Sequence, residues 1–74
     1  MRIIRTAEDL SDEELLAARD LAENSDGLGA DFAIGVAVSV VCEAPLGTLN
    51  LAGFCDTFRG RVDRLLLGGR KISA

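Results

Sequence analysis

An uncharged run of eleven residues, Phe32 to Cys42 (FAIGVAVSVVC), lies in the middle of a chain of only 74 residues. A chain this short must bury a large share of its apolar surface in order to fold, so a central apolar run is expected to form the core element. The length allows one hydrophobic core and therefore one domain. The run is also too short to cross a bilayer, which needs about 20 apolar residues. We expect the two ends of the chain to wrap around it.

The central run fits two secondary structures. As a strand, its large side chains alternate with smaller ones, which is typical of a buried strand. As a helix, it places Ala33 with Ala37 and Gly35 with Ser39 at a spacing of four residues. Such a helix carries two lanes of small side chains, where a second helix can approach closely.

The helix is favoured because a strand would have little to pair with. Residues 2–5 are the one other candidate strand, and a two-stranded sheet is marginally stable. We therefore expect a helix at about 31–44, capped by Asp26 or Asp31 and stopped by the proline and glycine that follow it. A strand at 32–42 in an α+β fold is the alternative.

An amphipathic helix is predicted before the central run. Ser11, followed three residues later by Glu14, is a capping box, so the helix should begin at Asp12 and occupy about 12–24. Acidic residues in its first turn oppose the positive end of the helix dipole. Its apolar stripe is expected to contain Leu15, Ala18, Leu21 and Ala22.

A second amphipathic helix is predicted after the run, at about 50–67. Its N-cap would be Thr48 or Asn50, and Gly68 with Gly69 should end it, leaving a mobile tail at 68–74. The apolar residues at helical spacing are Leu51, Phe54, Cys55, Phe58, Val62, Leu65 and Leu66.

The sequence thus predicts an all-α, compact three-helix domain. A central helix that is apolar on every side cannot be covered by two flanking helices, since each shields only part of its circumference. We therefore expect a homodimer through the small-residue lanes. The predicted interface residues are Ala33, Gly35, Ala37 and Ser39.

The composition offers little catalytic chemistry. The chain has no histidine, so the usual base for a serine or cysteine nucleophile is absent, and a structural zinc site lacks ligands. Cys42 and Cys55 have apolar neighbours and are expected to be free, packed thiols, although a disulfide remains open. We expect no enzyme activity, no metal and no cofactor. Without a stretch resembling a signal peptide, the cytoplasm is the expected location.

Charge is distributed unevenly within the net charge of −4. Residues 1–31 hold nine acids and three arginines, whereas residues 32–74 hold three acids and five basic residues. The two halves could complement each other within the fold. Alternatively, an acidic face could dock into a basic groove of a protein partner. That face would contain Glu13, Leu16, Asp20 and Glu23.

Nucleic acid is the alternative partner. Three arginines of the last predicted helix could contact phosphates: Arg59, Arg61 and Arg64. The acidic balance of the chain and its lack of tyrosine and tryptophan count against this function, because nucleic-acid-binding proteins concentrate positive charge and often stack aromatic rings on bases.

The stretches DLSDEELLAARDLA (residues 9–22) and CEAPLGTLNLAGFC (residues 42–55) resemble short helical proteins encoded by bacteriophages and plasmids. This resemblance implies an accessory protein of a mobile element. Such proteins include small acidic inhibitors that block host defence proteins, among them those of CRISPR systems. The resemblance assigns no role to an individual residue. Together with the charge distribution, it predicts a protein-binding module.

Overall fold

Three α-helices make up the fold in the computed structural model, which describes residues 2–25 and 27–73, with side chains described as far as residue 68. A short 3-10 helix, η1 (Ala7–Asp9), precedes α1 (Asp12–Glu23), α2 (Ala30–Cys42) and α3 (Leu51–Ser73). No strand occurs in these described ranges; an isolated parallel bridge joins Ile4 to Leu46. The all-α prediction is confirmed, and the alternative with a strand at 32–42 is wrong.

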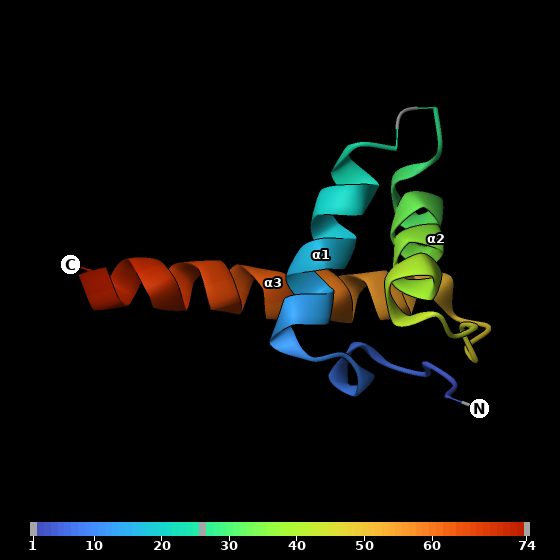
Figure 1. The fold of residues 1–74 in the computed structure, drawn as a ribbon, viewed down its shortest axis with the longest axis horizontal. Coiled ribbons are helices and arrows are strands. Elements are labelled where there is room, and N and C mark those ends of the chain that lie inside the picture. The colour runs from blue at the N-terminus through green and yellow to red at the C-terminus, as the bar shows by residue number, and fades with distance from the viewer. Residues whose placement is uncertain (1, 26, 74) are drawn as a thin grey trace.

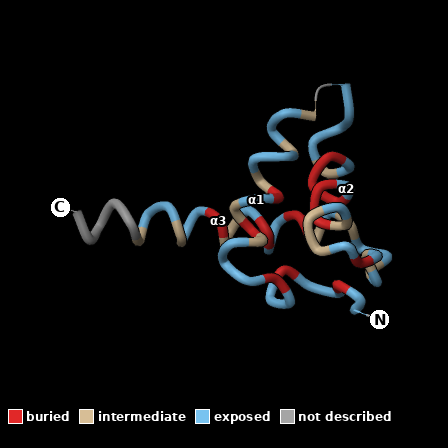
Figure 2. The backbone as a smooth tube through the Cα atoms, viewed as in Figure 1, coloured by how far each residue is buried: buried red, intermediate tan, exposed pale blue. Residues whose placement is uncertain are grey.

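The helices are arranged as an antiparallel pair packed across a third helix. Figure 1 shows α1 and α2 side by side, with α3 crossing them and its C-terminal part extending beyond α1. Buried residues are concentrated where the three helices meet, and none of residues 63–68 of α3 is buried (Figure 2). The N-terminal segment runs along the same end of the body as the α2–α3 loop. Its Ile4 donates a backbone hydrogen bond to Pro45 O at 3.0 Å and accepts one from Gly47 N at 2.7 Å.

The start of α1 follows the predicted capping box. Ser11 Oγ accepts a hydrogen bond from Glu14 N at 3.2 Å, and Glu14 Oε1 accepts one from Ser11 N at 2.9 Å. These two bonds satisfy backbone donors that lack partners within the helix. Leu15 and Ala18 are fully buried, as predicted, but Leu21 is 37% exposed. Because each residue rotates by about 100° around the helix, Leu21 lies at the edge of a stripe centred on Leu15, Ala18 and Ala22.

The bounds of α2 agree with the prediction to within two residues, but its N-cap differs. Gly29 is the N-cap, whereas Asp31 lies in the first helical turn and accepts a hydrogen bond from Arg59 Nη2 at 2.8 Å. The other predicted cap, Asp26, lies outside the described residues. Glu43, the C-cap residue that follows Cys42, adopts the left-handed conformation (φ 51°). This conformation costs a non-glycine residue about 1–2 kcal/mol.

The N-terminus of α3 and most of its apolar stripe agree with the prediction from the sequence, but its C-terminus does not. Asn50 Oδ1 accepts a hydrogen bond from Gly53 N at 3.0 Å and so caps the helix. Most of the predicted stripe supplies the core from this helix, with Phe54, Cys55, Phe58 and Val62 buried and Leu51 and Leu65 packed against it. The prediction was wrong for Leu66, which is 38% exposed. However, α3 continues through Gly68 and Gly69 to Ser73. A glycine ends a helix by adopting a positive φ, and within the described residues Gly27 is the one glycine that does so.

Candidate protein-interaction site

The outer side of α2 carries a row of large apolar side chains that the described residues leave partly exposed. Phe32, Val36 and Val40, which we call the α2 stripe, are 56%, 39% and 59% exposed. They follow one another at intervals of four residues and therefore lie on one side of the helix. Ile34 and Val38, on the opposite side, pack into the core, and so do Ala33 and Ala37, which lie between the two sides. Because the helix is apolar all round, folding of one chain buries only one of its sides.

A hollow of about 410 Å³ lies beside the α2 stripe. Leu46 and Leu51, from the α2–α3 loop and the start of α3, form its far wall, and Gly35 and Ser39 belong to its α2 side. Ser39 carries the one polar side chain among the described residues that line it. Leu49, between the two wall residues in sequence, is fully exposed. The stripe and the hollow together form a continuous, uncharged surface.

The predicted dimer lanes are not the exposed part of α2. Ala33 and Ala37 are 4% and 1% exposed, so they already pack inside their own chain. A side chain at Gly35 would meet the ends of Leu46 and Leu51 at 3.3 Å, and Ser39 is half-buried. The chain therefore uses its small residues for internal packing, and it exposes the large residues next to them.

The predicted acidic face lies on α1, with Glu13, Asp20 and Glu23 exposed and Leu16 half-buried. Two of its three carboxylates contact a cation of the same helix. Arg19 Nη1 lies 3.2 Å from Asp20 Oδ1, and Arg19 Nε lies 3.5 Å from Glu23 Oε1. The negative charge available to a partner is therefore smaller than the sequence suggests.

The three arginines proposed to bind phosphate have different environments. Arg61 Nη1 donates hydrogen bonds to the carbonyl oxygens of Ala7 and Leu10 at 2.6 and 2.8 Å, and its Nη2 lies 3.1 Å from Asp12 Oδ1. Its side chain is 18% exposed. Arg59 binds Asp31, and this hydrogen bond raises the pKa of the guanidinium. Arg64 is exposed.

These contacts link the acidic and basic halves of the sequence. Arg61 to Asp12 and Arg59 to Asp31 are ion pairs between α3 and the two preceding helices. The interpretation that the two halves complement each other within the fold is thus confirmed. Sequence reasoning identified the charge asymmetry, but it could not identify Arg61 as the residue that holds the η1–α1 junction.

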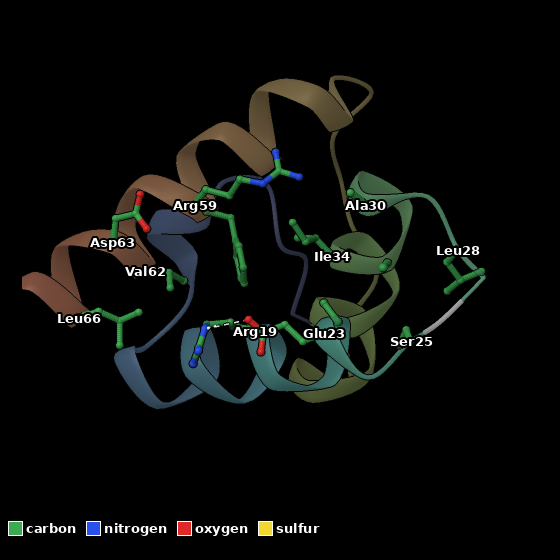
Figure 3. A pocket seen from close by; sticks show the side chains of 13 residues that line it. Arg19, Glu23, Ser25, Leu28, Ala30, Ile34, Arg59, Val62, Asp63 and Leu66 are labelled. Carbon is green, nitrogen blue, oxygen red and sulfur yellow. Dashed lines mark ion pairs between the residues drawn. The ribbon is translucent and has the colours of Figure 1, made fainter.

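A second groove, of about 590 Å³, is lined by residues of α1, α2 and α3. Figure 3 shows Arg59 and Asp63 on α3 across from Arg19 and Glu23 on α1, with Ile34 and Val62 between them. Each rim carries one positive and one negative side chain, so the groove has no single sign of charge. Sequence analysis did not predict this groove, because its lining residues come from all three helices.

The two cysteines are free thiols, as expected. Burial raises the pKa of both Cys42 and Cys55, and the nearby carboxylates of Glu14 and Asp31 raise it further. The thiolate is the nucleophilic form, so these thiols are poor nucleophiles at neutral pH. Within the described part of the chain, no three His, Cys, Asp or Glu side chains are grouped so as to hold a metal ion.

Comparison of this chain with protein-family models, with curated proteins and with solved structures gives no match. None of the described helices combines the length and the apolar character that crossing a membrane requires.

Proposed function

We propose that this chain is a protein-binding module without catalytic activity of its own, and that it binds through the α2 stripe and the adjoining hollow. The observation that carries the proposal is the exposure of Phe32, Val36 and Val40 on one side of the most apolar helix. Single exposed apolar residues are ordinary on protein surfaces, whereas a contiguous patch is typical of an interaction surface.

The size of the patch sets the expected affinity. Complete burial of an exposed Val or Phe side chain gains about 1.5–3 kcal/mol. The α2 stripe is about half exposed, so covering all three side chains gains about 3 kcal/mol. This gain supports a specific complex only when neighbouring residues also contribute, and Leu46, Leu49 and Leu51 are placed to do so. We expect a moderate rather than a tight interaction.

An inhibitor of a host defence protein is one form of this proposal, in which the occupant of the surface is a bacterial protein. The acidic face on α1 would then provide charged contacts around the apolar centre, mainly through Glu13, because Arg19 contacts Asp20 and Glu23. The nucleic-acid alternative has weaker support, because Arg61 is used within the fold and Arg59 is paired with Asp31.

Two matched substitutions test the proposal. Val40 and Leu67 are both 59% exposed, but Leu67 lies on the projecting part of α3. The tagged wild type, Val40→Glu and Leu67→Glu are used to capture proteins from a bacterial lysate, with and without nuclease. We expect a nuclease-resistant protein, whether an untagged copy of the chain or a host protein, with the wild type and Leu67→Glu but not with Val40→Glu. Equal capture by both variants would refute the assignment to α2, and capture lost on nuclease treatment would favour a nucleic-acid function.

A further inference from the structure

The residues on the outer side of α2 are spaced symmetrically about Val36. Gly29, Phe32, Val36, Val40 and Glu43 are separated by 3, 4, 4 and 3 residues. At 3.6 residues per turn, these five positions fall within a sector of about 80° around the helix. We infer that the occupant of the α2 stripe is a second copy of this chain, whose α2 packs antiparallel to the first about a twofold axis at Val36. This inference rests on the function proposed above.

A twofold axis at Val36 brings complementary residues together. In such a contact, residue i of one copy meets residue j of the other and the reverse also holds. Val36 therefore meets Val36 of the second copy, and Phe32 meets Val40 of the second copy. The large ring of Phe32 lies over a smaller β-branched side chain, beside the hollow that contains Ser39. A parallel arrangement would instead place Phe32 against Phe32 of the second copy.

The ends of the helix add charge complementarity. The N-cap Gly29 has no side chain with which to accept hydrogen bonds from the amides of the first turn, and this end of α2 is the positive end of its dipole. Glu43 is exposed at the other end. Both residues are seven positions from Val36, which is about 10 Å along the axis. The antiparallel packing therefore places the Glu43 carboxylate of each copy near the uncapped helix start of the other.

A second copy also suits the charge distribution of the whole surface. The chain has a net charge of −4, so most faces of one copy repel the same faces of another. The run from Phe32 to Cys42 has no charge, and the carboxylate just before it, Asp31, is paired with Arg59. The α2 side is therefore the face on which two copies approach with the least repulsion.

The available area implies a weak dimer. A standard interface takes about 800 Å² from each partner. That is about one sixth of the 4847 Å² that this chain exposes, and the α2 stripe provides only the apolar centre of such an area. We expect dissociation in the micromolar range or above, so the dimer should form and dissociate over concentrations that are accessible with purified protein.

The test uses two charge variants at the twofold axis, Val36→Lys and Val36→Glu. In a homodimer of either variant, like charges meet at the axis, whereas a mixed dimer brings opposite charges together. Sedimentation equilibrium measures the mass of each pure variant, of their equimolar mixture and of the wild type. We expect the wild type to shift from 7.8 kDa towards twice that mass as its concentration rises. Each pure variant should associate at least tenfold more weakly, and the mixture should regain association.

The control variants are Leu67→Lys and Leu67→Glu, which place the same charges at an exposed apolar position of α3. Each of them alone, and their mixture, should associate as strongly as the wild type. A second variant tests the register. Glu43→Lys places a positive charge near the positive helix end, so it should weaken association several-fold, whereas Asp63→Lys, at an exposed position of α3, should not. Circular dichroism confirms the helical content of every variant. If the Val36 variants fail to fold, the comparison of Glu43→Lys with Asp63→Lys still decides the inference.

The result that overturns the inference is a wild type that stays monomeric to millimolar concentration, or a Val36 mixture that associates no better than its components. In that case, lysate capture that is lost in Val40→Glu would still support the proposed function, with a different protein on the same surface. If the chain neither self-associates nor captures a protein through α2, both proposals fail.

Discussion

Replacement of Arg61 by methionine should lower the stability of the fold, although Arg61 is one of the residues that the sequence suggested for phosphate binding. Methionine keeps the long apolar stem but removes all the donors. The guanidinium donates to the carbonyl oxygens of Ala7 and Leu10, which belong to two residues that are 0% and 3% exposed. Because both residues are buried, the loss of the donor leaves part of the hydrogen-bonding capacity of these oxygens unused.

The size of the effect follows from these bonds. An acceptor left without its partner in a buried site costs about 1–3 kcal/mol. Ala7 O keeps a hydrogen bond from Leu10 N at 3.3 Å, so its loss is partial. The exposed pair with Asp12 adds at most about 1 kcal/mol. We expect Arg61→Met to cost about 2–3 kcal/mol, out of about 4–11 kcal/mol for a domain of this size. The stability of Arg61→Lys should lie between that of the wild type and that of Arg61→Met, because an ammonium group donates hydrogen bonds but cannot reproduce the planar arrangement of donors on a guanidinium.

Urea unfolding followed by far-ultraviolet circular dichroism measures this loss, since the chain has no tryptophan or tyrosine for fluorescence. The control is Arg64→Met, which removes an exposed arginine from the same helix and should change stability by less than about 0.5 kcal/mol. All measurements use one low protein concentration, because self-association would add stability. Equal unfolding midpoints for Arg61→Met and Arg64→Met would refute the structural role of Arg61.

Three further outcomes are expected, each from a different part of the fold. The hydrogen bond from Arg2 holds the pKa of Glu14 at about 2, below its usual 4.5, so the charged form stabilises the fold above about pH 4.5 and this contribution is lost as the pH falls towards 2. After allowance for solvent screening, the stability difference between wild type and Glu14→Gln should be about 1 kcal/mol at pH 7 and should vanish in acid, as measured by urea midpoints across a pH series; a difference independent of pH would contradict this assignment. Gly60→Ala should raise the free energy of unfolding by about 0.5–1 kcal/mol and the thermal midpoint by a few degrees, since nothing lies within 4 Å of the added methyl group and alanine favours the helix; a lower midpoint would show that the site is crowded. Leu15→Ala, at a fully buried position of α1, should cost about 3 kcal/mol in the same urea assay, and a cost below about 1 kcal/mol would mean that α1 does not pack as described.

The features that sequence reasoning predicted correctly are those that depend on neighbouring residues. The capping box at Ser11 and the apolar spacing from Phe54 to Val62 act within a few helical turns, so the sequence carries enough information to place them. The prediction that α3 ends at Gly68 and Gly69 was wrong for a related reason. Two adjacent glycines permit a helix to end but do not force it to, and the choice depends on what the following residues pack against.

The candidate site was harder to predict because it depends on which side of α2 is buried. On an amphipathic helix the polar side marks the solvent, but α2 has no polar side to provide this signal. The orientation is set by packing of Ala33 and Ala37 against the rest of the core, where small side chains allow close approach. The sequence therefore identified the apolar helix but carried no signal for which side of it is buried. The internal partners of Arg61 were likewise beyond prediction, because they lie far away in sequence.

The short bridge between Ile4 and Leu46 also has a consequence for the order of folding during synthesis. Ile4 is completely buried, but its backbone partners, Pro45 and Gly47, come from the loop that follows α2. The ribosome adds about 5–20 residues per second, so the N-terminal segment waits for several seconds before its docking site has been made. During that interval α1 and α2 can already pair, since both precede this loop. Although this segment is translated before the three helices, it is therefore among the last parts of the fold to acquire its native contacts.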